Sequence, residues 1–155
     1  MAGKAVNALA LALTTVLAAC SNKGPYLDIS GGGFIFNYRL SVAYAGFTAA
    51  PLRTLPDHSR IVATFENPSG GAPIVLSKDV TPGRNEYTFT TDSLKGIKIN
   101  KPYDVTIRLI GSDGKVIESI DKKFTSDVDE SVLADKPLTI GPGYTRNPAL
   151  DSSTQ

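Results

Sequence analysis

His58 is the only histidine in the 155-residue chain. Histidine is the side chain best suited to acid–base catalysis near neutral pH. A Ser-His-Asp arrangement would have to include it, yet the chain contains no Gly-x-Ser-x-Gly motif. His58 ends the predicted turn 55–58, where a solvated histidine is expected more often than a catalytic base. The residue types therefore predict that the protein is not an enzyme and has no catalytic residue.

The acidic residues offer one candidate cation site. Asp127, Asp129 and Ser131 alternate as the first ligands of a calcium loop do. Val132, however, stands where such a loop needs glycine, and Leu138 stands where it needs a bidentate glutamate. One cysteine and one histidine leave too few ligands for a typical zinc site. We expect no metal and no cofactor.

The single cysteine, Cys20, ends an apolar N-terminal run. Lys4 places one positive charge before residues 5–19, which are too short for a membrane span of about 20 residues. The order Leu-Ala-Ala-Cys at 17–20 resembles a bacterial lipobox. That resemblance implies cleavage after Ala19, diacylglycerol transfer to the Cys20 thiol and acylation, for example with palmitate, of the new terminus. The alternative is an ordinary secretory leader.

Ser21 bears on localisation. It follows the modified cysteine where an aspartate usually retains lipoproteins of enteric bacteria in the inner membrane. The resemblance therefore implies the periplasmic face of the outer membrane. Two or three acyl chains anchor a protein firmly, so we expect the mature chain to be tethered to the membrane by its N-terminal lipid.

Composition and charge exclude other classes of protein. Hydrophobic residues make up 41% of the chain and charged residues 20%, which is typical of a folded globular domain. The formal net charge is +1, so the chain lacks the basic excess of a nucleic-acid-binding protein. The length suits a single core.

The first part of the mature chain predicts a leash followed by strands. A polar leash is expected over residues 20–33, ending in three glycines, with the folded body starting at Phe34. Residues 34–44 alternate in apolar character and predict a strand, although they could also share one face of a helix. The segments 47–54 and 60–66 flank a turn and predict a hairpin.

Further strands are expected at 74–80 and 87–90, bounded by turns rich in Gly and Pro. Asp113-Gly114 predicts a hairpin turn into a strand that begins at Val116. The clearest alternation in the chain precedes that turn and places four side chains on one face: Tyr103, Val105, Ile107 and Leu109.

Together these segments predict an all-β fold. One helical turn is expected within 127–134 and a short strand at 138–140. Seven or eight short strands without a long helix favour an antiparallel two-sheet sandwich. Tyr103 is placed as in the tyrosine corner of immunoglobulin-like sandwiches. The predicted organisation is a lipoprotein signal peptide (1–19), the leash (20–33), the sandwich (34–143) and a C-terminal tail (144–155).

Segment 46–52 is the first candidate for binding a partner protein. It is apolar, from Phe47 to Leu52, and Pro51 lacks a backbone donor, which predicts an edge strand open to pairing with another protein. The alternative is a core strand with a blunted edge.

The tail is the second candidate. Tyr144, Arg146 and Asn147 lie among prolines, and Tyr and Arg are common in interface hot spots. The alternative is a terminal segment that covers the open end of the sandwich.

Several segments resemble the YscW/YbaY-type envelope lipoproteins, which are small β-sandwiches that include pilotins of type III secretion. The matching segments are 55–56, 60–65, 103–108, 113–115 and 137–140. Two further blocks, 31–39 and 136–144, are similar to uncharacterised lipoproteins of alphaproteobacteria. The resemblance implies a protein-binding module, pilotin-like in acting as a chaperone or assembly factor for an envelope or secretion component. The alternative is a structural or envelope-homeostasis lipoprotein without a single client.

Overall fold

The computed structural model describes residues 24–153, so the predicted cleavage position Ala19 and lipidation position Cys20 lie outside the described residues. The body of the protein consists of seven strands: β1 (Leu27–Asn37), β2 (Val42–Pro51), β3 (Arg60–Phe65), β4 (Ile74–Asp79), β5 (Tyr87–Thr90), β6 (Pro102–Ile110) and β7 (Val116–Thr125). Four short elements follow: the 3₁₀ turn η1 (Glu130–Val132), β8 (Thr139–Ile140), β9 (Thr145–Arg146) and the 3₁₀ helix η2 (Pro148–Ser153).

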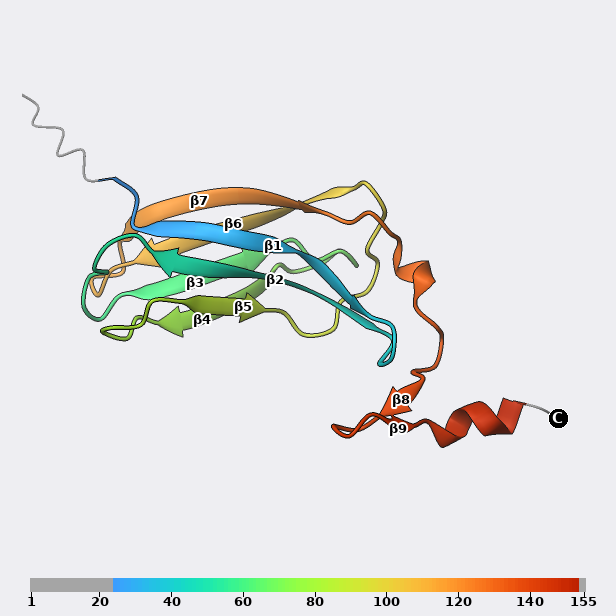
Figure 1. Ribbon diagram of the computed structural model, residues 1–155. Helices are drawn as coiled ribbons and strands as arrows, with labels where there is room; N and C mark the ends of the chain where they lie inside the picture. The colour runs from blue at the N-terminus through green and yellow to red at the C-terminus, as the bar shows by residue number, and fades with distance from the viewer. Residues whose placement is uncertain (1–23, 154–155) are drawn as a thin grey trace, which may run out of the picture.

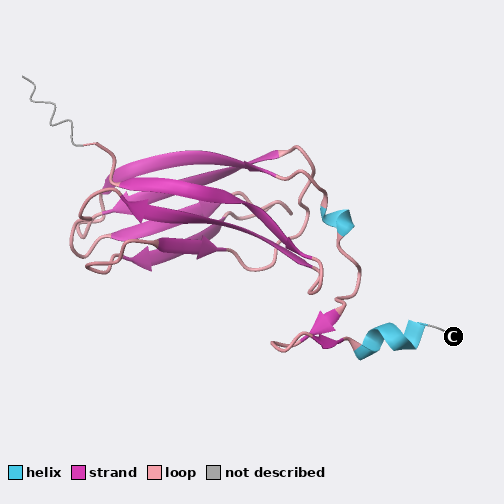
Figure 2. Cartoon of the chain, viewed as in Figure 1, coloured by secondary structure: helices cyan, strands magenta, loops and turns pink. Residues whose placement is uncertain are grey.

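The seven strands form two antiparallel sheets. One has the order β1-β2-β5 and the other the order β4-β3-β6-β7, whereas β8 and β9 pair only with each other. Figure 1 shows the two sheets face to face, and Figure 2 shows that within the described residues the helical turns come only after β7. The predicted all-β antiparallel sandwich is confirmed.

The core forms because alternate side chains on facing strands point inward. On β6 the four predicted inward residues are between 0% and 2% exposed, which confirms the predicted register. On β3 the side chains of Ile61, Ala63 and Phe65 are buried in the same way. Their partners in the facing sheet are mostly on β2 and β5.

Phe47 joins the two sheets at the centre of an aromatic cluster. Its ring centroid lies 5.0 Å from that of Phe89 in the same sheet and 5.8 Å from that of Phe65 in the other. The ring of Phe124 on β7 lies 6.5 Å away, edge-on. Such aromatic contacts stabilise the core beyond the area they bury.

Two tyrosines fix loops to this core. The buried Tyr103 accepts a hydrogen bond from the Lys98 amide at 2.9 Å and donates one to the Gly96 carbonyl at 3.3 Å, which confirms the predicted tyrosine corner. Tyr87 does the same for the β4–β5 loop, because its hydroxyl bonds both the amide and the carbonyl of Thr81.

The predicted leash and the predicted start of the body are corrected by β1. This strand begins at Leu27, seven residues before Phe34, and the Leu27 side chain is 3% exposed. The Glu118 carboxylate accepts the backbone N–H groups of Tyr26 and Leu27, each at 3.0 Å, and so holds the start of β1 against β7. Residues 27–33 therefore belong to the sandwich.

The three glycines lie within β1 and form an irregularity in its pairing with β2. The register shifts between Ser30 and Gly33, and all three glycines have positive φ. A Cβ atom on Gly32 would lie 2.7 Å from the ring of Phe124, so only glycine fits there. The three glycines, predicted as the end of the leash, instead form a β-bulge packed on the core.

The single strand predicted over 34–44 is wrong, and so is its helical alternative, because the chain turns between β1 and β2. The Asn37 side-chain oxygen accepts the N–H groups of Arg39 and Leu40, each at 3.1 Å. Ser41 completes the turn with a φ of 55°. An Asx turn thus takes the place of the Gly or Pro that marks the other turns.

The hairpin predicted for 47–54 and 60–66 is also wrong. β2 lies between β1 and β5, whereas β3 lies in the other sheet between β4 and β6. The intervening segment crosses from one sheet to the other. Segment 46–52 is therefore mostly a central strand, and Pro51 stands at its end, opposite Leu27.

Candidate partner-binding surface at the tail

The two ends of the sandwich differ in what they carry. In Figure 1, β1 enters the sandwich at one end, and the tail extends beyond the opposite end. We use the name tail hairpin for residues 137–147, which contain β8 and β9. The tail hairpin is separated from the last sandwich strand by η1.

The tail hairpin exposes three large apolar side chains. Leu138 is 47% exposed, Ile140 is 42% exposed and Tyr144 is 48% exposed. Tyr144 has a φ of 51°, a left-handed conformation that is uncommon for a tyrosine. Exposed apolar side chains gathered in one small element are typical of interaction sites.

The three predicted tail residues have different environments. Tyr144 is exposed, as a contact residue must be. Arg146 is also exposed and forms an ion pair with Asp151 of η2 at 2.6 Å. Asn147 is only 7% exposed, and its side chain donates to the Pro137 carbonyl at 2.8 Å and accepts the Ala149 N–H at 3.0 Å. Asn147 therefore closes the tail hairpin.

Three hydrogen bonds attach this region to the β1–β2 turn. The Thr139 amide and hydroxyl donate to the Arg39 carbonyl at 3.0 Å and 3.3 Å. The Ser41 hydroxyl donates to the Ala134 carbonyl. Because these are polar contacts on the outside of the body, the tail hairpin is placed next to the sandwich without entering its core.

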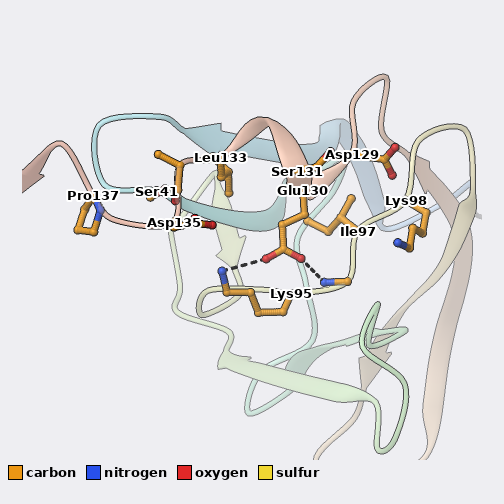
Figure 3. A pocket seen from close by; sticks show the side chains of 12 residues that line it. Ser41, Lys95, Ile97, Lys98, Asp129, Glu130, Ser131, Leu133, Asp135 and Pro137 are labelled. Carbon is orange, nitrogen blue, oxygen red and sulfur yellow. Dashed lines mark hydrogen bonds and ion pairs between the residues drawn. The ribbon is translucent and has the colours of Figure 1, made fainter. Parts of the chain in front are cut away.

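A polar groove of about 600 Å³ separates η1 and the start of the tail hairpin from the β5–β6 loop. Its centre is Glu130, whose carboxylate pairs with Lys95 at 2.9 Å and accepts the Gly96 N–H (Figure 3). The Asp129 carboxylate accepts the Ile99 N–H at 2.9 Å. The groove is therefore braced by hydrogen bonds between segments about 30 residues apart in the sequence.

The pKa of Glu130 reflects this bracing. Partial burial raises it, but the hydrogen bonds from Lys95 and Gly96 and the positive charges of Lys95 and Lys98 together hold the pKa of Glu130 below its usual range. Glu130 is thus charged at neutral pH, and its carboxylate is bonded to Lys95 and Gly96. This suits a structural role better than proton transfer.

The described residues contain no group of three His, Cys, Asp or Glu side chains placed to hold a metal ion. Asp129 and Ser131 line the groove, but the Asp129 carboxylate bonds the backbone. His58 is exposed in the β2–β3 turn with a φ of 56°, which confirms its predicted place in a solvated turn.

The other predicted binding segment is not an open edge. Phe47 is 4% exposed and belongs to the core, so its assignment as a partner-binding residue is wrong. Leu52 lies just beyond β2 and is 58% exposed, and its amide donates to the Tyr26 carbonyl next to the start of β1. The end of β2 and the tail hairpin lie at opposite ends of the sandwich (Figure 1). The structure does not bring the two candidate segments together.

No protein-family model matches the chain, and no curated protein matches it. No helix within residues 24–153 is long and apolar enough to cross a membrane. The resemblance to YscW/YbaY-type lipoproteins therefore remains a prediction from the sequence segments.

Proposed function

We propose that the protein is a lipid-anchored periplasmic module that binds another envelope protein through its tail hairpin. In the pilotin-like version of this role, it acts as a chaperone or assembly factor for an envelope or secretion component. The bound partner would be held near the outer membrane by the acyl chains on Cys20.

The observation that carries this proposal is the exposure of Leu138, Ile140 and Tyr144 in an element outside the core. These side chains contribute little to the body of the protein, since the sandwich has its own core. Their exposure in water is unfavourable, and a partner with an apolar surface would relieve it.

The position of the tail hairpin also supports the proposal. The chain enters the sandwich at one end, and the tail hairpin extends from the other (Figure 1). A lipid attached at Cys20, seven residues before β1, would hold the entry end near the membrane. The tail hairpin would then face the periplasm, where partner proteins are accessible.

The partner surface is tested by site-specific photo-crosslinking in intact cells. A photoreactive residue at position 140 should give a discrete adduct with one envelope protein, whereas the same residue at the exposed position Val75 on β4 should give none. Adducts of equal yield at both positions, or none at position 140, would favour the structural lipoprotein without a client.

A matched pair of variants measures the contribution of these side chains. Ile140→Thr together with Tyr144→Asn should weaken partner binding at least about tenfold, as expected for interface hot spots. Asn tolerates the left-handed backbone of position 144, so the fold should be unaffected. The control is Val75→Thr, which also removes an exposed apolar side chain and should leave binding unchanged.

The anchor is tested separately. Cys20→Ser should abolish incorporation of labelled palmitate and leave the precursor uncleaved, because the lipobox chemistry requires the thiol. Incorporation of palmitate into this variant would refute lipidation at Cys20 without bearing on the tail hairpin.

A further inference from the structure

A second pocket opens at the end of the sandwich where β1 enters. It has a volume of about 330 Å³ and lies between the β2–β3 loop and the β4–β5 loop. Figure 1 shows both loops at the end of the sandwich where β1 begins. Three charged residues line the pocket: Arg53, Asp57 and Arg84.

Arg53 is held at the pocket by an aromatic ring and has one buried donor without a partner among the described residues. Its Cζ atom lies 3.4 Å from the centroid of the Tyr26 ring, so the two planes are in contact. Its Nε atom is buried and has no hydrogen-bond partner within residues 24–153. Within residues 24–153 no hydrogen bond or ion pair engages the terminal NH₂ groups of Arg53, so these groups can donate to an anion in the pocket.

Arg84 lines the same pocket from the other loop. Its Nε–H donates to the Glu86 carbonyl at 2.8 Å, and its Cζ atom lies 5.1 Å from the centroid of the buried Tyr87 ring. These contacts fix the side chain and leave its terminal NH₂ groups available. A guanidinium held in this way recognises the oxygens of a phosphate with paired donors.

The balance of charge in the pocket is positive. Among the described residues that line it, Asp57 is the only carboxylate, against two guanidinium groups. Asp57 forms no ion pair with either arginine in the described part of the chain. The lining therefore favours an anionic ligand.

The pocket is tied to the predicted anchor. The Leu52 amide donates to the Tyr26 carbonyl at 2.9 Å, and Arg53 stacks on the same tyrosine. Tyr26 is six residues after Cys20, and six residues span at most about 20 Å when extended. The pocket must then lie within about that distance of the lipid, and the exposed Leu52 stands at its edge.

We infer that Arg53 and Arg84 bind the phosphate of an anionic phospholipid headgroup. This inference rests on the proposed anchoring at Cys20, which brings the pocket to the headgroup layer. Binding of a headgroup would add a second, non-covalent contact with the membrane and would orient the sandwich with its tail hairpin away from the lipid.

The test uses the mature chain from position 20 carrying Cys20→Ser, which has no acyl chain and keeps every described residue. It should sediment with vesicles of phosphatidylglycerol and phosphatidylcholine and bind at least tenfold more weakly to vesicles of phosphatidylcholine alone. Arg53→Gln with Arg84→Gln should reduce binding to the phosphatidylglycerol vesicles at least tenfold. Arg84→Gln alone changes an exposed loop, so this variant should retain the fold. Its binding to the phosphatidylglycerol vesicles should still fall several-fold.

The matched control removes two positive charges at the other end of the sandwich. Lys98→Gln with Lys136→Gln should change vesicle binding less than twofold. Equal losses in the two double variants would mean unspecific attraction to negative charge and would overturn the site.

Inorganic phosphate distinguishes a lipid from a free anion. At 10 mM it should shift the melting temperature of the unlipidated chain by less than about 1 °C, because no headgroup contacts accompany it. Tight binding of inorganic phosphate without vesicle binding would overturn the lipid as the ligand. None of these results depends on palmitate incorporation or on the crosslinks from position 140.

Discussion

The sandwich and the tail hairpin are stabilised in different ways. The sandwich buries an aromatic cluster around Phe47, whereas the strands of the tail hairpin have no buried side chain. The tail hairpin is held by polar contacts, chiefly those of Thr139 and Asn147. Burial stabilises a fold, while exposed apolar side chains are available to a partner. The contrast therefore separates the part that supports the protein from the part that can recognise another.

The largest expected effect is on the core. Phe47→Ala should destabilise the protein by about 3–5 kcal/mol, because it removes a buried ring and leaves a cavity between the sheets. Chemical denaturation measures the change. Tyr144→Asn is the control and should change stability by less than about 0.5 kcal/mol, as surface substitutions usually do. A similar loss in both variants would remove the distinction between the two regions.

An intermediate effect is expected at the junction between the regions. Glu130→Gln should lower the free energy of local opening at Gly96 by about 1 kcal/mol, because it removes a charged acceptor for the Gly96 amide. Hydrogen exchange of that amide should become roughly fivefold faster. Amides of β6 should exchange at their original rates.

The same junction should respond to acid. The pKa of Glu130 is lowered in the folded protein, so its contribution is complete above its ordinary value near 4.5 and is lost as the pH falls through the lower, folded value. The protection of the Gly96 amide, measured as its exchange rate relative to the intrinsic rate at the same pH, should therefore fall below about pH 4.5 in the original protein. In the Glu130→Gln variant this fall in protection should be absent.

The smallest effect is expected from removing the tail. A chain ending at Lys136 loses the tail hairpin and η2 but keeps η1 and every core residue. Its free energy of unfolding should fall by less than about 1 kcal/mol, because no buried apolar side chain is removed. A larger loss would show that the tail covers the end of the sandwich, as the alternative interpretation of the sequence held.

The sequence was sufficient for the strands whose side chains alternate regularly. β6 is the best example, because Tyr103, Val105, Ile107 and Leu109 repeat with period two and the Asp113-Gly114 turn fixes where the strand ends. The beginning of β1 carried the same signal, with Leu27 and Ile29 facing the core and Asp28 and Ser30 outside. The nearby glycines obscured it, since they are as common in linkers as in bulges.

Pairing between strands could not be predicted in the same way. Alternation shows that a segment is a strand but does not show which sheet it joins. The sequence therefore predicts one hairpin for β2 and β3, although these strands lie in different sheets. The turn before β2 depends on the Asn37 side chain instead of Gly or Pro.

The sequence predicts the tail as a candidate surface, but the environments of its residues depend on contacts that no local pattern contains. Asn147 is an example, because its partner Pro137 is ten residues away. The groove around Glu130 could not be predicted for the same reason, because its ion-pair partner Lys95 lies 35 residues earlier in the chain.

The bulge in β1 has a consequence for how copies of the protein coexist. β1 is an outer strand of its sheet, and a long regular strand in that position is a template for pairing with a neighbouring molecule. Under the proposed anchoring at Cys20, copies of the protein would meet in two dimensions at a high local density. The run of glycines with positive φ interrupts the row of backbone groups that such a neighbour would need. Anchored copies would then lie side by side without merging their sheets into an aggregate.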